Sequence, residues 1–390
     1  MVRRVNKMGT IPYALPMIAD EEIKEVIDTI KSNWLSKGPK TVEFEGKIKE
    51  YVNANFGIGL NSCTAGLHLA QLAAGIGPGD EVITTPYTFV ASANTIIHTG
   101  ATPVFVDIDP VTMNIDPALI EEKITPRTKA IIPVHFAGYP CDMDPIMEIA
   151  RKHNLIVIED AAHAIYTQYK GKMIGSIGDF TCFSFYATKN LVTGEGGLVT
   201  THSEEWADKV RIMSLHGMSK NAWNRYGDKG TWYYEVDYPG YKYNMTDIQA
   251  SFGLVQLSKL EKMQQIREKY AQIYNEQLAN IEGITLPHHD DINRHAWHLY
   301  VIRVDESQFT IDRGEFIEKL KEKGIGTSVH FIPVPMHPYY KGLGYKIEDY
   351  PNALSAYNGA ISLPLYPRMS EEEVTQVIEA VRDVATSYRK

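Results

Sequence analysis

The sequence predicts an α/β protein, with a large domain built on a mostly parallel mixed sheet and a smaller C-terminal α+β domain. The chain has 390 residues, which is too many for one hydrophobic core. Between residues 56 and 199, short apolar runs alternate with amphipathic helical segments, as βαβ units require. A long helical stretch over 246–281 then precedes a different pattern. We therefore expect two domains, residues 1–254 and 255–390.

The elements follow from local patterns in chain order. A helix begins near residue 20, where DEEIKEVIDTIKSNW has apolar residues at helical spacing and acidic residues in its first turn. The apolar runs expected to form strands are FGIGL, EVITT, TPVFVDI, KAIIPVHF, NLIVIED, FTCFSF and GGLVTT. The second domain is expected to contain the run WHLYVIRV, the helix GEFIEKLKEKG, the segment IGTSVHFIPV and a terminal helix EEEVTQVIEAVRDVATSY.

Composition and charge narrow the class of function. Hydrophobic residues make up 44% and charged residues 22%, as in an ordinary soluble protein, and the net charge of −9 argues against nucleic-acid binding. The sequence has neither a secretory signal nor an apolar stretch long enough to span a membrane, so we expect a cytoplasmic enzyme. Cys63, Cys141 and Cys182 lack metal-ligand spacing, which predicts reduced, buried thiols and no metal site.

Ligands of open α/β sheets bind at the carboxyl ends of the strands. Four segments at expected strand ends carry suggestive side chains. The simplest is TPYTFVASAN (85–94), in which Tyr87 and Phe89 follow the strand EVITT. An aromatic ring at this point can cover one face of a cofactor, or it can belong to the core.

The segment NSCTAGLH (61–68) follows the strand FGIGL and opens a helix. A turn of small residues at a helix N-terminus presents free N–H groups and the positive end of the dipole, which suits a phosphate. Ser62 and Thr64 can add hydroxyl donors. The same residues can equally serve as an ordinary N-cap, because serine and threonine are favoured there without any ligand.

The segment LIVIEDAAHA (155–164) places Glu159 and Asp160 at the end of a buried strand. A carboxylate at that depth needs a cationic or hydrogen-bonding partner, since its desolvation is otherwise costly. A protonated pyridine nitrogen is such a partner. A helix-capping aspartate explains the segment equally well.

The segment DFTCFSFYATKNLVTGEGGLVTT (179–201) contains Ser184 and Lys189. Most lysines are solvated surface charges. Lys189, however, follows a strongly apolar strand and precedes a glycine-rich turn, which favours a partly buried amine. A lysine with a lowered pKa is the group that forms a Schiff base.

Taken in order, these motifs closely resemble the DegT-type family of sugar aminotransferases, which use pyridoxal phosphate (PLP). The resemblance runs through SNWLSKGPKTVEFE, NSCTAGLHLA, PYTFVASAN, VIEDAAHA, GDFTCFSFYATKN, YKYNMTDIQASFGL and IGTSVHFIPVPMHPYY. It covers nearly the whole chain. It implies the aspartate aminotransferase-like fold (PLP fold type I), with PLP bound by the large domain.

The resemblance also implies roles for individual residues. Lys189 corresponds to the lysine that holds PLP as an internal aldimine, and Asp160 to the carboxylate that keeps the pyridine nitrogen protonated. His163 stands where the family places a group against the phenolic oxygen, and Phe89 corresponds to the aromatic that stacks on the ring. The residues matching the phosphate cup are Ser62, Thr64, Ala65 (through its N–H) and Ser184. Asn244 corresponds to an asparagine that reaches the neighbouring subunit's phosphate, which implies a homodimer with shared active sites.

The segment SNWLSKGPK resembles family members that aminate C4 of a sugar ring. The implied reaction transfers the amino group of L-glutamate to a nucleotide-linked 4-keto sugar, often 6-deoxy, with pyridoxamine phosphate (PMP) as the intermediate cofactor form. Candidate substrate contacts are Trp34 and Leu35 in this segment, Arg225 in AWNRYG and His330 in VHF. An arginine fork suits a carboxylate or a diphosphate, although a solvated loop arginine explains Arg225 as well.

Several alternatives remain at this point. A C3-specific aminotransferase of the same family differs only in the position aminated. A dehydratase branch replaces the Schiff-base lysine by histidine, and Lys189 speaks against it. A PLP-binding regulatory homologue without catalysis is disfavoured by the presence of both Lys189 and Asp160. An NAD-dependent sugar-nucleotide enzyme ranks last, because no strand-turn segment carries a G-x-G-x-x-G motif.

Overall fold

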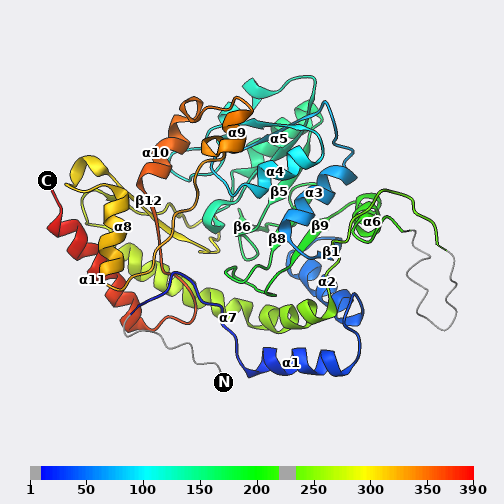
Figure 1. The fold of residues 1–390 in the computed structure, drawn as a ribbon, viewed down its shortest axis with the longest axis horizontal. Coiled ribbons are helices and arrows are strands. Elements are labelled where there is room, and N and C mark those ends of the chain that lie inside the picture. Colours follow the sequence, from blue (N-terminus) through cyan, green and yellow to red (C-terminus); the bar gives the residue numbers. More distant parts are fainter. Residues whose placement is uncertain (1–9, 219–233) are drawn as a thin grey trace.

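The computed structural model describes residues 10–218 and 234–390. Within these residues, a seven-stranded sheet forms the centre of the larger part of the molecule (Figure 1). Each of its strands coincides with one of the seven apolar runs in the sequence. In spatial order the strands are β1 (Phe56–Leu60), β9 (Gly197–Thr201), β8 (Phe180–Ser184), β5 (Ile156–Asp160), β4 (Thr128–Ile132), β2 (Glu81–Thr84) and β3 (Thr102–Phe105).

The sheet is mixed because β9 runs against its neighbours. It pairs antiparallel with both β1 and β8, whereas β8, β5, β4, β2 and β3 pair in parallel. The predicted α/β class with a mostly parallel mixed sheet is therefore confirmed. The carboxyl ends of β1, β2, β4, β5 and β8 share one edge of the sheet, which brings together segments that are far apart in the sequence.

Helices cover both faces of this sheet, which explains why its strands are apolar along their whole length. Successive residues alternate between two cores: Ile131 and Val157 pack on one side, Ile132 and Ile158 on the other. The helices of the first side are α2 (Pro39–Tyr51), α5 (Met143–His153) and the first half of α7 (Asp247–Leu278). Those of the second side are α3 (Cys63–Ala73), α4 (Ala91–His98) and α6 (Glu204–Met213).

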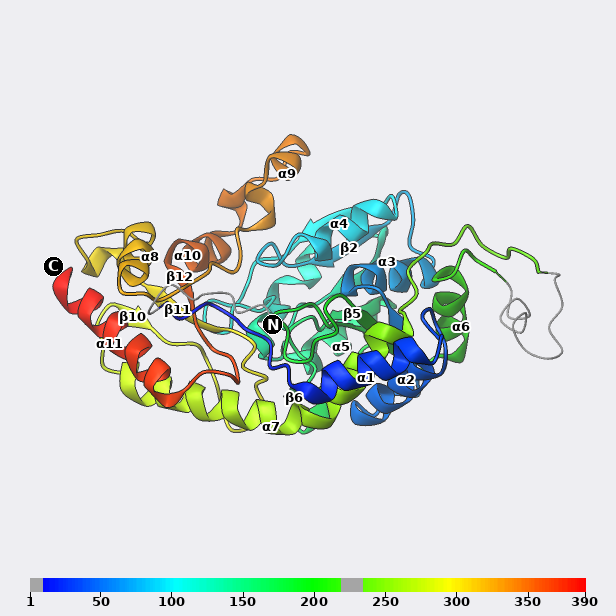
Figure 2. The ribbon, with the colours of Figure 1, turned by 60° about the horizontal axis from the view of Figure 1, so that its bottom comes forward.

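Helix α7 connects the two parts of the molecule. It begins at a capping box formed by Thr246 and Gln249, and it runs from beneath the large sheet to the second part (Figures 1 and 2). The boundary expected near Leu254 falls inside this helix. Side chains up to Met263 pack into the first core, and from Tyr270 onward they pack into a separate one.

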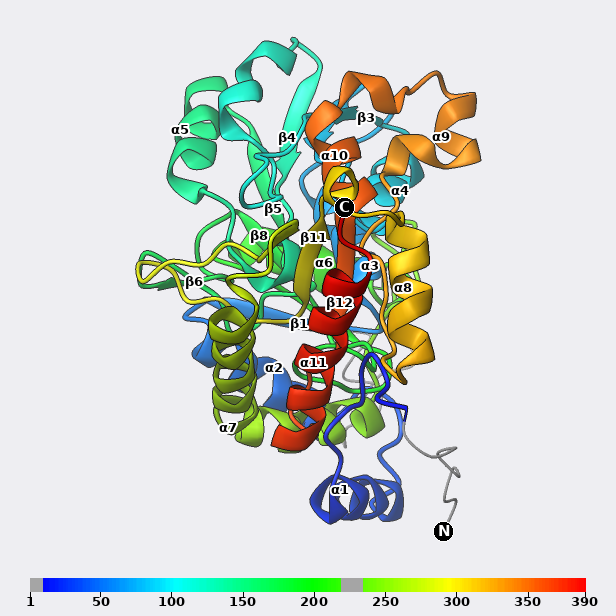
Figure 3. The ribbon, with the colours of Figure 1, turned by 90° about the vertical axis from the view of Figure 1, so that its left-hand side faces the viewer.

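That separate core lies around a three-stranded antiparallel sheet in the described C-terminal region (Figure 3). Ile11 also packs into it, because the backbone near Ile11 pairs with Ile325. The elements are β10 (Ile284–Thr285), β11 (Tyr300–Val304), β12 (Ala360–Leu363), α8 (Arg313–Glu322) and α11 (Glu371–Ser387).

The remaining elements lie at the periphery of the two parts. They are α1 (Asp20–Lys31), which packs along α7, the short hairpin β6 (Gln168–Tyr169) and β7 (Lys172–Met173), α9 (Pro338–Gly342) and α10 (Pro351–Gly359). None of the helices in residues 10–218 and 234–390 combines the length and apolar character needed to cross a lipid bilayer. All three cysteines are buried and form no disulfide, as the sequence predicts.

Candidate active site

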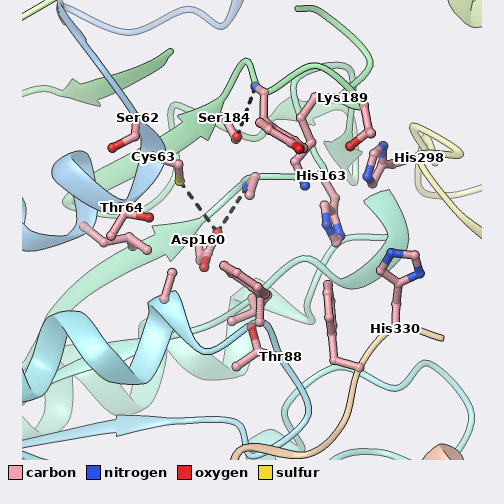
Figure 4. Close-up of a pocket in the computed structure, with 18 of the residues that line it drawn as sticks. Ser62, Cys63, Thr64, Thr88, Asp160, His163, Ser184, Lys189, His298 and His330 are labelled. Atoms are coloured by element: carbon pink, nitrogen blue, oxygen red, sulfur yellow. Dashed lines mark hydrogen bonds between the residues drawn. The ribbon is translucent and has the colours of Figure 1, made fainter. Parts of the chain in front are cut away.

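A cavity of about 370 Å³ lies at the carboxyl edge of the large sheet. Its walls come from the ends of β5 and β8, the start of α3, the turn after β8 and two segments of the C-terminal part. This volume is typical of sites for small molecules and cofactors. The predicted site residues that line it are Phe89 and, as labelled in Figure 4, Ser62, Thr64, Asp160, His163, Ser184, Lys189 and His330.

Asp160 ends β5 and is buried in the floor of the cavity. Its carboxylate accepts hydrogen bonds from Ser92 Oγ at 2.7 Å and from the Ala162 N–H at 3.2 Å, and the Cys63 thiol lies 3.9 Å away. Burial raises the pKa of this carboxyl group. Within the described residues no lysine or arginine pairs with it at contact distance. A buried carboxylate held only by neutral donors is suited to receive a cationic ligand group.

The neighbouring carboxylate, Glu159, faces the other side of the sheet. It is fully buried, and it accepts hydrogen bonds from the Gly178 N–H at 2.8 Å and from Thr181 Oγ1 at 2.7 Å. His135 Nε2 lies 3.0 Å from its second oxygen. The alternation of side chains along a strand thus separates the two carboxylates, and Asp160 is the one that reaches the cavity.

Lys189 lies in the turn that connects β8 to β9, and its backbone N–H bonds to the Tyr186 carbonyl at 2.9 Å. Its side chain enters the cavity (Figure 4). Burial lowers the pKa of Lys189 to about 8, and the nearby Asp160 carboxylate partly opposes this effect. Part of the population is therefore a neutral amine near physiological pH, which is the nucleophilic form of lysine.

The start of α3 forms the opposite end of the cavity. Ser62 is the N-cap of this helix, and its Oγ accepts a hydrogen bond from the Ala65 N–H at 3.1 Å. Thr64 is exposed toward the cavity, whereas Ala65 is buried beside it. Ser184, at the end of β8, completes the group of hydroxyls. Hydroxyls around the positive end of a helix dipole can bind a phosphate.

A glycine permits this arrangement. Gly197, the first residue of β9, lies so close to the start of α3 that an added Cβ would be 2.3 Å from the Ser62 carbonyl carbon and 2.4 Å from the Cys63 nitrogen. Any other residue would push α3 away from the sheet. The last glycine of the GEGG sequence is thus explained by the close approach of the helix N-terminus to β9.

Three histidines lie on the far side of Lys189 from Ser62 and Thr64 (Figure 4). His163 and His298 are buried, with ring centroids 4.3 Å apart. Burial lowers the pKa of both imidazoles well below the usual value, and it lowers that of His330 to about 4. The three rings are therefore neutral at pH 7. The Ala137 N–H donates to His163 Nδ1 at 3.2 Å, so the hydrogen of His163 is on Nε2.

Aromatic side chains form the outer wall. Phe89 is 58% exposed, and its ring centroid lies 6.0 Å from that of Phe331. Tyr186 is also exposed and lines the cavity. Tyr87 belongs to the core instead, and its hydroxyl donates to the His330 carbonyl at 2.7 Å. Of the two aromatic residues singled out in TPYTFVASAN, Phe89 therefore faces the ligand space and Tyr87 supports it.

The other predicted residues lie elsewhere. Trp34 and Leu35 are about half exposed after α1 and do not line the cavity of their own chain. Asn244 is buried before α7, and its Nδ2 donates to the Met245 carbonyl at 3.1 Å. Arg225 lies outside the described residues.

Cys63, Tyr186, His298 and Phe331 also line the cavity and were not among the predicted site residues. Cys63, Tyr186 and Phe331 stand inside the motifs NSCTAGLH, FYATKN and IGTSVHFIPV, so their proximity to Thr64, Lys189 and His330 in sequence was the available signal. His298 belongs to the run WHLYVIRV of the C-terminal part. Only the packing of that part against the large sheet brings it to Lys189.

The residues present fit PLP. Asp160 suits a protonated pyridine nitrogen, Lys189 suits an aldehyde, and the start of α3 suits a phosphate, all within one cavity. Comparison with solved structures agrees on this class. Spr1654 of Streptococcus pneumoniae, described as a putative sugar aminotransferase, was solved in its PLP and PMP forms. Its structure superimposes on this one with a TM-score of 0.91 and 38% sequence identity, over 97% of this chain and 98–99% of the Spr1654 chain. Helicobacter pylori PseC, an aminotransferase involved in pseudoaminic acid biosynthesis, gives a TM-score of 0.91 at 30% identity over 97% of this chain and 100% of its own.

The protein is thus a PLP-dependent aminotransferase, with PMP as the other form of its cofactor. Residues 16–382 match the DegT/DnrJ/EryC1/StrS aminotransferase family, and the chain belongs to it. Among its relatives, the spore coat polysaccharide biosynthesis protein SpsC of Bacillus subtilis is 59% identical over 98% of this chain and 99% of its own length. The resemblance inferred from the sequence is confirmed.

Proposed function

We propose that the protein transfers the amino group of L-glutamate to a nucleotide-linked 4-keto sugar, often 6-deoxy, and yields a 4-amino sugar nucleotide by a ping-pong mechanism. The cavity that holds Lys189 and Asp160 together carries this proposal. The description of Spr1654 supports a sugar substrate, and that of SpsC supports a role in polysaccharide synthesis. The segment SNWLSKGPK supports C4 over C3 through its resemblance to C4-aminating family members.

Each side chain at the reacting end has a defined task in this proposal. When bound, PLP supplies an electron-withdrawing ring that no amino-acid side chain can replace. Lys189 holds the cofactor covalently through Nζ and later moves a proton as a neutral amine. Asp160 keeps a proton on the pyridine nitrogen by ion pairing. His163 donates its Nε2 hydrogen to the phenolic oxygen, because its Nδ1 already accepts from the Ala137 N–H.

The remaining cofactor contacts fix its position. Phe89 covers one face of the ring, for which its exposed side chain at the cavity wall is suited. The hydroxyls of Ser62, Thr64 and Ser184, together with the Ala65 N–H, hold the phosphate at the start of α3. His330, with its neutral imidazole at the opposite end, contacts the substrate.

We further propose a homodimer in which each chain completes its partner's site. Asn244 then reaches the partner's phosphate, and Trp34, Leu35 and Arg225 contact the substrate. The loop that carries Trp34 is tied to the start of α7, because the Gly38 N–H donates to Asp247 Oδ1 at 2.7 Å. The segments that carry Trp34 and Asn244 are therefore held next to each other, with Trp34 exposed and Asn244 buried. Next to them, α1 exposes an apolar stripe, which a second copy would cover: Ile23, Ile27 and Ile30.

The cellular setting of the proposal is the cytoplasm, where nucleotide-linked sugars and L-glutamate would serve as the substrates. The three buried thiols agree with a reducing compartment. Fractionation of cells that express a tagged chain tests this location. Recovery in the membrane fraction or outside the cell would contradict it.

The substrate proposal can be tested in a single turnover. The protein is converted to its PMP form with L-glutamate, desalted, and mixed with a nucleotide-linked 4-keto-6-deoxyhexose or with its 3-keto isomer. The 4-keto compound should restore the PLP absorbance, and NMR of the product should show nitrogen on C4. Restoration by the 3-keto isomer alone would establish the C3-specific alternative. Sedimentation of the protein over a concentration series tests the dimer.

A further inference from the structure

The amide of Asn190, the residue after Lys189, has a fixed orientation. Its Nδ2 donates to Gln264 Oε1 at 2.9 Å and to the Ala296 carbonyl at 2.7 Å. Gln264 Nε2 donates to the same carbonyl at 2.7 Å. A carbonyl oxygen accepts hydrogen bonds and cannot donate them, so both amide nitrogens must face Ala296. Asn190 Oδ1 is therefore the atom that faces His298.

This orientation fixes the tautomer of His298. Its Nδ1 lies 2.9 Å from Asn190 Oδ1, and since that oxygen only accepts, the hydrogen must be on Nδ1. Burial keeps the pKa of the imidazole well below its usual value, so the ring carries this single hydrogen. Its Nε2 then holds a lone pair. His163 is the opposite case, with its hydrogen on Nε2.

The backbone of His298 is also held. Its N–H donates to the Ala137 carbonyl at 2.9 Å. Arg267, a buried residue of α7, donates from Nη1 to the carbonyls of Trp297 at 3.2 Å and Leu365 at 2.7 Å. The imidazole therefore has little freedom to rotate or to exchange its tautomer, and the cavity wall presents a permanent acceptor beside Lys189.

We propose that His298 Nε2 binds the amino group of the amine substrate as a hydrogen-bond acceptor, and that Asn190 positions it for this task. The inference rests on the proposed function, because L-glutamate enters as an ammonium ion that needs acceptors. His163 presents a hydrogen, and Lys189 Nζ is bonded to the cofactor in the proposed function. Asp160 lies on the other side of the cavity and is bonded to Ser92 and Ala162 (Figure 4). His298 Nε2 is an acceptor of fixed tautomer next to Lys189.

Two neighbouring groups are weaker candidates for this task. The Glu195 carboxylate lines the cavity, but it is exposed to solvent, which competes for it. His330 Nδ1 lies 2.8 Å from Ser362 Oγ, and a hydroxyl can donate or accept. The tautomer of His330 is therefore not fixed by its partner, in contrast to that of His298.

The first test is the tautomer itself, and it does not depend on any substrate. The holoprotein is labelled with ¹⁵N-histidine, and His298→Gln identifies the two ring nitrogens of His298 by their loss from the spectrum. At pH 7, Nδ1 should resonate as a protonated nitrogen and Nε2 as a lone-pair nitrogen. Asn190→Leu should remove this preference. A hydrogen on Nε2, or a doubly protonated ring, would overturn the inference.

The second test is the reaction with L-glutamate, followed by the conversion of the PLP absorbance to that of PMP in a rapid-mixing experiment. His298→Phe removes the acceptor and should raise the L-glutamate concentration for half-maximal rate by about 10-fold to 100-fold, as for a lost hydrogen bond to a charged group. His298→Gln, whose amide oxygen can accept, should recover part of this loss. The control is His295→Gln, a buried residue of the same loop that does not line the cavity.

The possible outcomes distinguish a failure of the role proposed for His298 from a failure of L-glutamate as the amino donor. An unchanged concentration dependence in His298→Phe would overturn the role of His298. An equal effect of His295→Gln would also overturn it, since loop structure would then explain both. If the wild type failed to respond to L-glutamate, the proposed donor would be wrong, and the same variants compared with L-glutamine would decide on His298.

Discussion

The pKa of Lys189 leads to a prediction that needs no sugar substrate. Burial lowers this pKa from 10.5 to about 8, against the opposing effect of Asp160. The neutral amine is the form that bonds covalently to PLP. At pH 7.5, about a quarter of such lysines are neutral, against about one in a thousand ordinary lysines. The apoprotein should therefore take up PLP about 200-fold faster than it would through an ordinary lysine of the same reactivity.

The assay measures the visible absorbance after apoprotein is mixed with PLP at a series of pH values. The uptake rate should rise with pH, because deprotonation creates the nucleophile, and it should level off above about pH 8. Asp160→Asn removes a negative charge that raises the Lys189 pKa. In this variant, the midpoint of the rise of the uptake rate with pH should therefore lie at lower pH. Glu159→Gln is the matched control and should keep the wild-type midpoint, since Glu159 bonds Gly178 and Thr181 outside the cavity. A wild-type midpoint near that of an ordinary lysine would show that burial does not lower the pKa of Lys189. A midpoint that Asp160→Asn leaves unchanged would show that Asp160 does not raise it.

Three further substitutions test separate parts of the site. Lys189→Ala should fold and still bind PLP, but transamination should fall by about 10²-fold to 10⁴-fold or more, and borohydride should no longer fix the cofactor to the chain, as mass spectrometry can check. Glu159→Gln should lower the free energy of unfolding by about 2 kcal/mol, because a fully buried side chain loses its hydrogen bonds to Gly178 and Thr181. The absorbance of the bound cofactor should stay that of the wild type, and denaturant titration measures the change in stability. A changed spectrum with unchanged stability would contradict the placement of Glu159 outside the cavity. Ser62→Ala should cost about 1 kcal/mol through loss of the α3 N-cap and should weaken PLP binding, whereas binding of pyridoxal, which lacks the phosphate, should be affected only slightly.

The sequence was sufficient for the large sheet and for one side of the site. Its seven apolar runs became the seven strands, because strands buried on both faces must be apolar throughout. Asp160, Ser184 and Lys189 could be predicted because each stands at or just after a strand end. Glu159 and Asp160 point to opposite faces of the sheet because side chains alternate along a strand. The sequence alone did not say which of the two faces the ligand.

The opposite side of the site depends on long-range packing. His298 lies more than a hundred residues from Lys189 in sequence, and the two meet because Asn190 bonds to His298 and to Gln264 of α7. Ile11 joins the C-terminal core through Ile325 in the same way. The strand β12 was also not predicted, since GAISLPL is too short a run to separate from its flanking helices. Local sequence patterns do not indicate which distant residues will contact each other in the folded chain.

The most direct test of the aminotransferase site is the absorbance spectrum of the purified protein with PLP, taken before and after L-glutamate is added. We expect a yellow protein whose visible band disappears with L-glutamate as the PMP form and 2-oxoglutarate appear. Lys189→Ala should show neither change. A protein that takes up no PLP, or a Lys189→Ala variant that reacts like the wild type, would contradict the assignment of this cavity as the aminotransferase site.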